Sequence, residues 1–291
     1  MASIPIKASP DVLETLKKQP NTLPIKLLAL AIVLSLAIWS FIAIKFNGIN
    51  PLGINVVRNL SRYFINPNYN PSDQPLEINV LSKYLFSLEK YAVPYLMFET
   101  IMIAFIGTFL GAIISIPFAF MSSKNIVGGT GSWFGATLIT VIRTVPIFVW
   151  GIVFIRVQGG AFAGVLAIAV SSIGMISKLY IEVIEDIDTG ILEALDSTGA
   201  TTLQKIRFGI IPQLTASFLS TAIYRFEINV KNATILGMVG AGGIGFTLID
   251  ALGSFNFPIV AVCLWGIIPV VLSIEYLSTS LRSKLASSER S

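Results

Sequence analysis

Long uninterrupted apolar runs constrain this chain more than any other feature of its sequence. Six runs are each long enough to form a helix of about 25 Å or more, close to the ~30 Å hydrocarbon core of a bilayer. Only 12% of the residues are charged, against about a quarter in a typical soluble domain. We therefore expect an all-α integral membrane protein with six transmembrane helices, at Leu27–Ile44, Tyr95–Met121, Trp133–Phe154, Gly160–Ile176, Gln213–Val239 and Phe257–Leu277.

The distribution of Lys and Arg predicts which side of the membrane each connection occupies. Six spans place both termini on one side, and the segments on that side carry 11 Lys and Arg, against 6 in the other segments. The positive-inside rule therefore favours a cytoplasmic N terminus. The first run is too long for a signal peptide and no small-residue cleavage site follows it, so we expect an uncleaved span. The predicted parts are a cytoplasmic segment 1–26, a first span with its outer loop 27–93, a membrane core 94–277 containing the cytoplasmic loop 178–213, and a cytoplasmic tail 278–291.

Several classes of chemistry are excluded by what the sequence lacks. It contains no G-x-x-x-x-G-K-[ST] motif, so we expect no ATP site of the P-loop kind. It has no histidine and a single cysteine, Cys263, which argues against most metal and Cys/His catalytic arrangements. Its net charge of +4 is dispersed, so nucleic acid is not an expected partner. We expect no catalytic residues, no metal site and no bound cofactor in this chain.

One glycine-rich motif matches the sequence pattern of a dinucleotide-binding site. Residues 240–245 read GAGGIG and match G-x-G-x-x-G, but they follow a membrane span. A dinucleotide site needs a preceding strand and an acid about 20 residues later. The next acids, Asp250 and Glu275, lie five and thirty residues on. We interpret the motif as a glycine-rich break at the outer membrane edge, where backbones pack closely or move.

Residues 193–212 form the longest polar segment between two spans in the second half of the chain. They predict two short helices. Thr189 is placed to cap the first, and Gly199 to end it in a left-handed conformation. Thr201 and Gln204 have the spacing of a capping box for the second helix. The proline that closes the segment is expected to stop this helix before the next span.

The fifth span carries charged and amide side chains inside the membrane. A charge there costs about 2.5–3.5 kcal/mol and usually marks a pathway or a paired core. At 100° per residue, Arg225, Asn229 and Asn232 share one face of the helix. Glu227 and Lys231 form an i,i+4 pair on the opposite face.

Two interpretations of these charges stay open. The Arg225 face either borders an aqueous path for an anion or is paired within the bundle, for example with Glu99. Arg143 lies three residues before Pro146, and proline favours a kink. A kinked helix with a cation suits a gate, although a structural pair between Arg143 and Glu227 is equally compatible with the sequence. The candidate path or gate is therefore Arg143, Pro146, Arg225, Glu227, Asn229 and Lys231.

The polar segment resembles the signature of permease subunits of ABC importers, E-A-A, three residues, G, nine residues, I-x-L-P. Glu193, Ala194, Gly199 and Pro212 match it at the right spacing. Three positions depart from it, namely Leu195, Gly209 and Ile211. The resemblance implies a type I ABC importer permease fold in which this loop docks into the ATPase subunit. The implied coupling residues are Glu193, Ala194, Gly199, Ala200 and Pro212.

Longer stretches are similar to the permease subunit of phosphonate-type importers. They include RTVPIFVW at 143–150, IGMISKLY at 173–180 and YRFEINVKNAT at 224–234, and the similarity covers most of 95–277. It implies a homodimer in the bacterial inner membrane, two cytoplasmic ATPase subunits that hold ATP and Mg, and an extracytoplasmic binding protein. The implied cargo is a phosphorus oxyanion, whether phosphonate, phosphite or hypophosphite. ATP binding would close the ATPase dimer and turn the spans outward, and hydrolysis would reset them.

Three rival functions follow from the same residues. The glycine-rich motif would serve a membrane-bound enzyme if it held a nicotinamide cofactor. The intramembrane charges would serve an ion-coupled secondary transporter. An ABC permease for another small solute, such as methionine, would share the broader architecture.

Overall fold

The computed structural model describes residues 23–44, 51–69, 81–85 and 92–288, and every regular element in these ranges is a helix. The chain divides into two units, residues 1–54 and 55–291. In the first unit, α2 (Leu23–Ala43) is apolar throughout, and all of its side chains are exposed. Its mean hydropathy of 2.4 fits a helix in contact with hydrocarbon.

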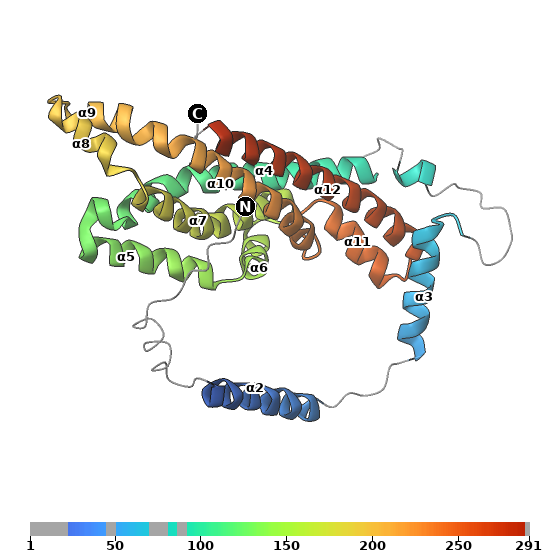
Figure 1. Ribbon diagram of the computed structural model, residues 1–291. Helices are drawn as coiled ribbons and strands as arrows, with labels where there is room; N and C mark the ends of the chain where they lie inside the picture. Colours follow the sequence, from blue (N-terminus) through green and yellow to red (C-terminus); the bar gives the residue numbers. More distant parts are fainter. Residues whose placement is uncertain (1–22, 45–50, 70–80, 86–91, 289–291) are drawn as a thin grey trace, which may run out of the picture. The chain divides into compact units, whose positions relative to one another are not determined.

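The second unit is built around two long helices. α4 (Val93–Ser122) and α7 (Ala161–Glu185) pack along one another, α10 (Ile211–Gly237) packs against both, and α12 (Phe257–Ser288) packs against α10 (Figure 1). Small residues make this closeness possible, because a Cβ on Gly111 of α4 would lie 3.0 Å from a carbonyl oxygen of α7. The other elements are α3 (Pro51–Ile65), η1 (Leu81–Leu85), α5 (Lys124–Thr144), α6 (Ile147–Val157), α8 (Thr189–Ser197), α9 (Thr202–Lys205), η2 (Ile206–Ile210) and α11 (Ile244–Gly253).

The described helices agree with the predicted spans, five of them as single helices and the third as a bent pair. Five of the described helices are long and apolar enough to cross a membrane alone, and the pair α5 and α6, bent by 80°, gives a sixth span if the pair is counted as one. The bend falls at Val145 and Pro146, where the sequence predicts a break. Proline cannot continue the ladder of hydrogen bonds, and it disfavours helical geometry in the residue before it. The last span, α12, also continues through Ser288, beyond its expected end at Leu277.

The glycine-rich break after α10 is a site of close backbone packing, as the sequence interpretation proposes. Gly240, Gly242 and Gly243 have φ values of 98°, 80° and 71°, which side chains with a Cβ rarely adopt. The Ile244 amide donates to Thr100 Oγ1 at 3.0 Å, which fixes the start of α11 against α4. The motif follows a helix instead of a strand, so the βαβ context that a dinucleotide site requires is absent from this described segment.

Gly245 lies so close to the backbone at the end of α10 that a larger residue there is expected to destabilise the protein. A Cβ on Gly245 would overlap the Thr234 carbonyl and lie 2.8 Å from the Met238 amide nitrogen, so the backbone itself would have to move. We expect Gly245→Ala to destabilise the folded protein by about 3 kcal/mol. Gly253→Ala is the matched control, because a Cβ there meets nothing within 4 Å. Thermal unfolding in detergent would show a lower midpoint for Gly245→Ala only, and equal midpoints would contradict this packing.

Candidate functional site

A cluster of polar side chains is buried in the bundle around Arg225 of α10. Arg225 is 6% exposed, and its guanidinium donates to Ser171 Oγ at 3.1 Å and to Ser172 Oγ at 3.4 Å. Asn229 is fully buried and donates to Ser172 Oγ and Thr108 Oγ1, both at 2.8 Å. The cluster therefore joins α10 to α7 and to α4. We call these five residues, with Asn232, the Arg225 cluster.

The positive charge of this cluster has no carboxylate partner. Among the described residues Arg225 makes no ion pair, and its side-chain hydrogen bonds go to hydroxyl groups alone. The alternative pairing of Arg225 with Glu99 is therefore not found. Asn232 donates to Asn229 Oδ1 at 3.4 Å, so the predicted shared face is confirmed. A buried charge without a counter-charge is costly, and within a membrane it usually marks a functional position.

The opposite face of α10 forms a charge-balanced clamp with α12. The predicted pair of Glu227 and Lys231 is confirmed, with 3.8 Å between Lys231 Nζ and Glu227 Oε1. Glu227 also accepts from Ser278 Oγ at 2.9 Å and from Arg282 Nη2 at 3.3 Å. Lys231 Nζ lies 3.0 Å from Glu275 Oε2. Two acids and two bases thus neutralise one another across the helices, and this favours a structural role for Glu227 and Lys231.

Arg143 approaches the Arg225 cluster from another helix. It lies in the last turn of α5, is exposed, and makes no ion pair among the described residues. Its alternative partner, Glu227, is engaged in the clamp instead. The Arg143 side chain passes Gly174 of α7 so closely that a Cβ there would lie 2.7 Å from Arg143 Cγ. Gly174 is within one turn of Ser171, so two cations from α5 and α10 flank the same short stretch of α7.

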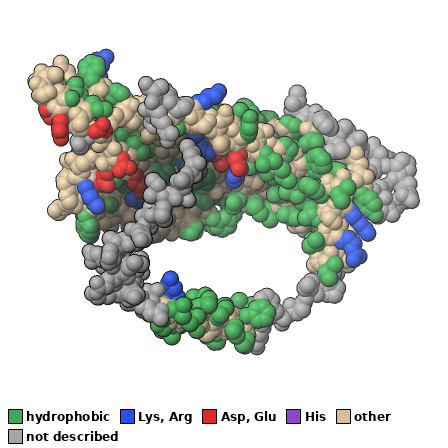
Figure 2. Space-filling view, viewed as in Figure 1, with side chains coloured by type: hydrophobic (Ala, Val, Ile, Leu, Met, Phe, Trp, Pro, Cys, Tyr) green, Lys and Arg blue, Asp and Glu red, His purple; other side chains and the backbone are tan. Residues whose placement is uncertain are grey.

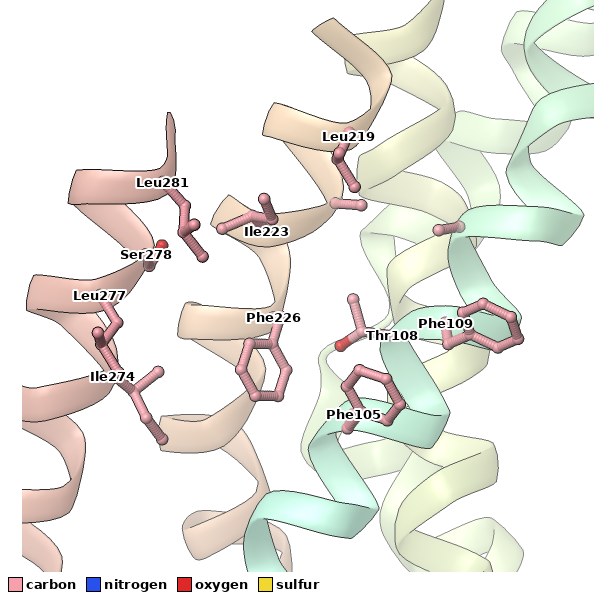
Figure 3. A pocket seen from close by; sticks show the side chains of 12 residues that line it. Phe105, Thr108, Phe109, Leu219, Ile223, Phe226, Ile274, Leu277, Ser278 and Leu281 are labelled. Atoms are coloured by element: carbon pink, nitrogen blue, oxygen red, sulfur yellow. The ribbon is translucent and has the colours of Figure 1, made fainter. Parts of the chain in front are cut away.

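An apolar cavity of about 400 Å³ lies between α4, α10 and α12 (Figure 3). Phe105 and Phe226 meet edge to face across it, with ring centroids 6.0 Å apart. Its hydroxyl-bearing lining residues are Thr108 and Ser278, which belong to the Arg225 cluster and to the clamp. This lining suits hydrocarbon and does not suit an anion, so the cavity is not the candidate site.

The polar loop after α7 is a helical hairpin made of α8 and α9 (Figure 1). Gly199 has the predicted left-handed conformation, with φ of 73°. The Gly199 amide donates to the Asp196 carbonyl at 2.9 Å, and the Ala200 amide to the Leu195 carbonyl at 3.1 Å. This pair of bonds is a Schellman motif. An ion pair between Lys205 and Asp196 joins the two helices across the turn.

The helix caps agree with the sequence in one case and differ in the other. Thr201 donates its backbone N–H to Gln204 Oε1 at 2.8 Å, which is the expected contact of a capping box. The prediction of Thr189 as the cap of the first helix is wrong by one residue. Asp188 is the cap, and its carboxylate accepts from the Gly190 amide at 2.8 Å. Asp and Thr are both good caps, so the preceding residue takes the position when it also offers an acceptor.

The expectation that Pro212 stops the second helix is wrong. α9 continues through the π-helical turn η2 into α10, and Pro212 is the second residue of α10. A π-helical turn changes the hydrogen-bond register, which allows a residue without an N–H to enter a continuous helix. The side-chain Nε2 of Gln213 donates to the Gly209 carbonyl at 2.8 Å, and this stabilises the turn.

The outer surface of the hairpin is exposed and acidic. Glu193, Ala194 and Gly199 are all exposed, as is Pro212 at its base. Figure 2 shows red carboxylates gathered at the end of the second unit that carries α8 and α9. The exposed acids of this region are Glu182, Glu185, Asp186, Asp188, Glu193 and Asp196. Such a surface can meet a partner with basic residues.

Several residues of these sites were missed by the sequence reasoning. Ser171 and Ser172 form a hydroxyl pair within an apolar run, which is the signal that could have marked them. Thr108 lies in the apolar second span, where nothing in the sequence marks it. The partners of the clamp, Ser278 and Arg282, carry no signal because they are 51 and 55 residues from Glu227.

Comparisons with known proteins agree on one family. The family model described as "Binding-protein-dependent transport system inner membrane component" matches residues 111–287. A phosphate-import permease of Mycolicibacterium smegmatis is 36% identical over 195 residues, 66% of this chain and 37% of the relative. A phosphite transport system permease of Stutzerimonas stutzeri is 35% identical over 192 residues, 64% of this chain and 68% of the relative. A putative cryptic phosphonate transport system permease of Escherichia coli K12 is 42% identical over 117 residues, 40% of this chain and 96% of the relative.

The solved structures support the same fold. The inward-facing MetNI methionine ABC transporter superposes with a TM-score of 0.56 at 20% identity, covering 65% of this chain and 94% of the other. At this identity the likeness shows the fold alone, which is that of type I importer permeases. The matched part of this chain spans little more than a third of the mycobacterial relative. Because the family model covers more than half of the sequence, this multi-pass chain is a member of the binding-protein-dependent transport system inner membrane components, a family of transport permeases and not of enzymes.

Proposed function

We propose that this chain is the permease subunit of an ATP-driven importer for phosphonate or a related phosphorus oxyanion, such as phosphite or hypophosphite. The names of the relatives, which cover phosphate, phosphite and phosphonate, support this class of cargo. The observation that carries the proposal is Arg225, buried in the bundle without a carboxylate partner among the described residues.

The chemistry of the Arg225 cluster fits an oxyanion. A guanidinium offers five N–H donors in a planar fork, and Arg225 uses two of its nitrogens on serine hydroxyls. Serine hydroxyls can turn to donate to an anion as well. Arg143 adds a second cation on the same stretch of α7. In this proposal Arg143, Arg225 and Asn229 border the path, Pro146 allows α6 to move as a gate, and Glu227 with Lys231 hold α12.

In this proposal the hairpin of α8 and α9 couples the ATPase subunit to movement of the spans. Glu193, Ala194, Gly199, Ala200 and Pro212 would lie against an ATPase subunit that holds ATP and Mg. Two copies of this chain would form the membrane part, with two ATPase subunits on the cytoplasmic side. An extracytoplasmic binding protein would deliver the anion. ATP binding would displace the hairpins and turn the path outward, and hydrolysis would return it.

Competition for uptake tests the cargo class. Proteoliposomes would contain this chain with its ATPase and binding protein, and radiolabelled phosphite uptake would be measured with excess methylphosphonate, hypophosphite, phosphate or D-methionine. We expect at least one of the unlabelled phosphorus compounds to suppress uptake about tenfold or more, and D-methionine to have no effect. Suppression by D-methionine alone, or transport of labelled D-methionine and none of the phosphorus compounds, would contradict the proposal.

A further inference from the structure

Three connections tie α7, and the short link that follows it, to α10. At the middle connection the rings of Tyr180 and Phe218 stack with centroids 3.8 Å apart, and Tyr180 Oη donates to the Phe218 carbonyl at 3.3 Å. The three positions, two in α7 and the third at Asp188 just beyond its end, are eight residues apart, and their partners run in the opposite direction along α10, as in an antiparallel hairpin. The connections join Ser172 to Arg225, Tyr180 to Phe218, and the Asp188 backbone to Gln213.

The connection at the loop end uses both ends of one side-chain amide. Gln213 Oε1 accepts from the Asp188 backbone N–H at 3.0 Å, and Gln213 Nε2 donates to the Gly209 carbonyl at 2.8 Å. Asp188 is the cap of α8, and Gly209 lies in the π-helical turn η2. One side chain thus bridges the start of the hairpin and the turn through which the hairpin enters α10.

The packing beside this bridge is incomplete. A cavity of about 580 Å³ lies beside the bridge, lined by residues that include Ile187, Ile191 and Ser217. Residues 186–188 are not helical, whereas α9, η2 and α10 follow one another without a break. A movement of the hairpin therefore reaches α10 through continuous helix, but reaches α7 through a short non-helical link, whose last residue, Asp188, is held to α10 by the Gln213 bridge.

From this geometry we infer that Gln213 is a positioning residue for coupling: its amide holds α8 to the base of α10, so that the hairpin, α7 and the Arg225 cluster move as one body. The inference rests on the proposed coupling role of the hairpin. Without the bridge the hairpin still reaches its ATPase partner, because Glu193 and Gly199 are untouched. Its displacement is then absorbed by residues 186–188 before it reaches α7, so less of it reaches Ser172, and Ser172 no longer moves together with Arg225.

Gln213→Met tests this role, because methionine has a similar length and cannot form either hydrogen bond. Thr215→Val is the matched control: Thr215 is exposed, lies two residues away, and donates only within its own helix, to Ile211. The first readout is amide hydrogen exchange over residues 186–192 in the full chain. We expect exchange about 3- to 30-fold faster in Gln213→Met and unchanged in Thr215→Val. If exchange over these residues were unchanged in Gln213→Met, the claim that the Gln213 bridge holds α8 would be overturned.

The second readout is the amount of anion imported per ATP hydrolysed in proteoliposomes that hold the assembled complex. We expect this ratio to fall about 3- to 30-fold in Gln213→Met, with ATPase binding retained, and to stay at the wild-type value in Thr215→Val. A wild-type ratio in Gln213→Met would overturn the coupling role. If the wild-type complex itself imported no anion, the proposed function would fail, while the exchange measurement would still decide whether the bridge holds α8.

Discussion

Arg225→Gln is expected to lower uptake of the phosphorus oxyanion by roughly 30- to 1,000-fold, the effect typical of removing one charge from a buried hydrogen-bonded contact. Glutamine can still donate to Ser172, so the bundle keeps a polar partner at this position. What disappears is the positive charge, which no described carboxylate balances. The measurement is initial uptake in proteoliposomes, together with the size-exclusion profile of the assembled complex to confirm that it remains intact.

Two further variants show whether a loss of uptake comes from removing the charge at position 225 or from replacing any arginine. Arg156→Gln removes an exposed arginine from the last turn of α6 and should leave uptake near the wild-type rate. Arg225→Lys keeps the charge but loses the planar fork, so we expect an intermediate rate. If Arg225→Gln transported at the wild-type rate with the same order of preference among anions, Arg225 would have no role in the path.

Gly199→Val is expected to reduce ATP-dependent uptake more than tenfold. Gly199 has φ of 73°, and a β-branched residue in this region costs about 1–3 kcal/mol of backbone strain. The chain can relieve that strain by opening the Schellman motif between Leu195 and Ala200. The two short helices then change their relative angle, and the exposed surface around Glu193 no longer fits one rigid partner.

Co-purification of the ATPase subunit with this chain is the direct measurement. We expect Gly199→Val to retain little ATPase while the permease itself stays folded, because the hairpin lies at the end of the bundle. Gly253→Val places the same side chain at a glycine where a Cβ meets nothing within 4 Å, and should retain the ATPase. Normal co-purification and normal uptake by Gly199→Val would show that this turn is not part of the docking surface.

The architecture could be predicted from the sequence because it depends on local properties. Long apolar runs fix the number of spans, and Pro146 fixes the position of the 80° bend. The turn at Gly199 follows from a glycine at the end of a short polar helix. The close packing at Gly240–Gly245 follows from glycines that a helix interior would not favour. Each of these features requires only neighbouring residues.

The partners of the intramembrane charges could not be predicted, because they depend on how distant helices rotate against one another. A helical wheel places Arg225 and Asn229 on one face, but it does not show that α7 presents Ser171 and Ser172 to that face. One of the two open interpretations paired Arg225 with a carboxylate such as Glu99, and the partners found are hydroxyls. The error at Pro212 has a local cause, since a π-helical turn lets the helix pass a proline that would ordinarily end it.

Accumulation of a phosphorus oxyanion with and without internal ATP tests the central claim most directly. Proteoliposomes would hold this chain, its ATPase and its binding protein, and uptake of methylphosphonate, phosphite and phosphate would be compared. The account predicts ATP-dependent uptake of at least one of them, lost when Gly199 or Glu193 is replaced. Uptake driven by an ion gradient without ATP, or no ATP-dependent uptake of any of the three by an intact complex, would contradict it.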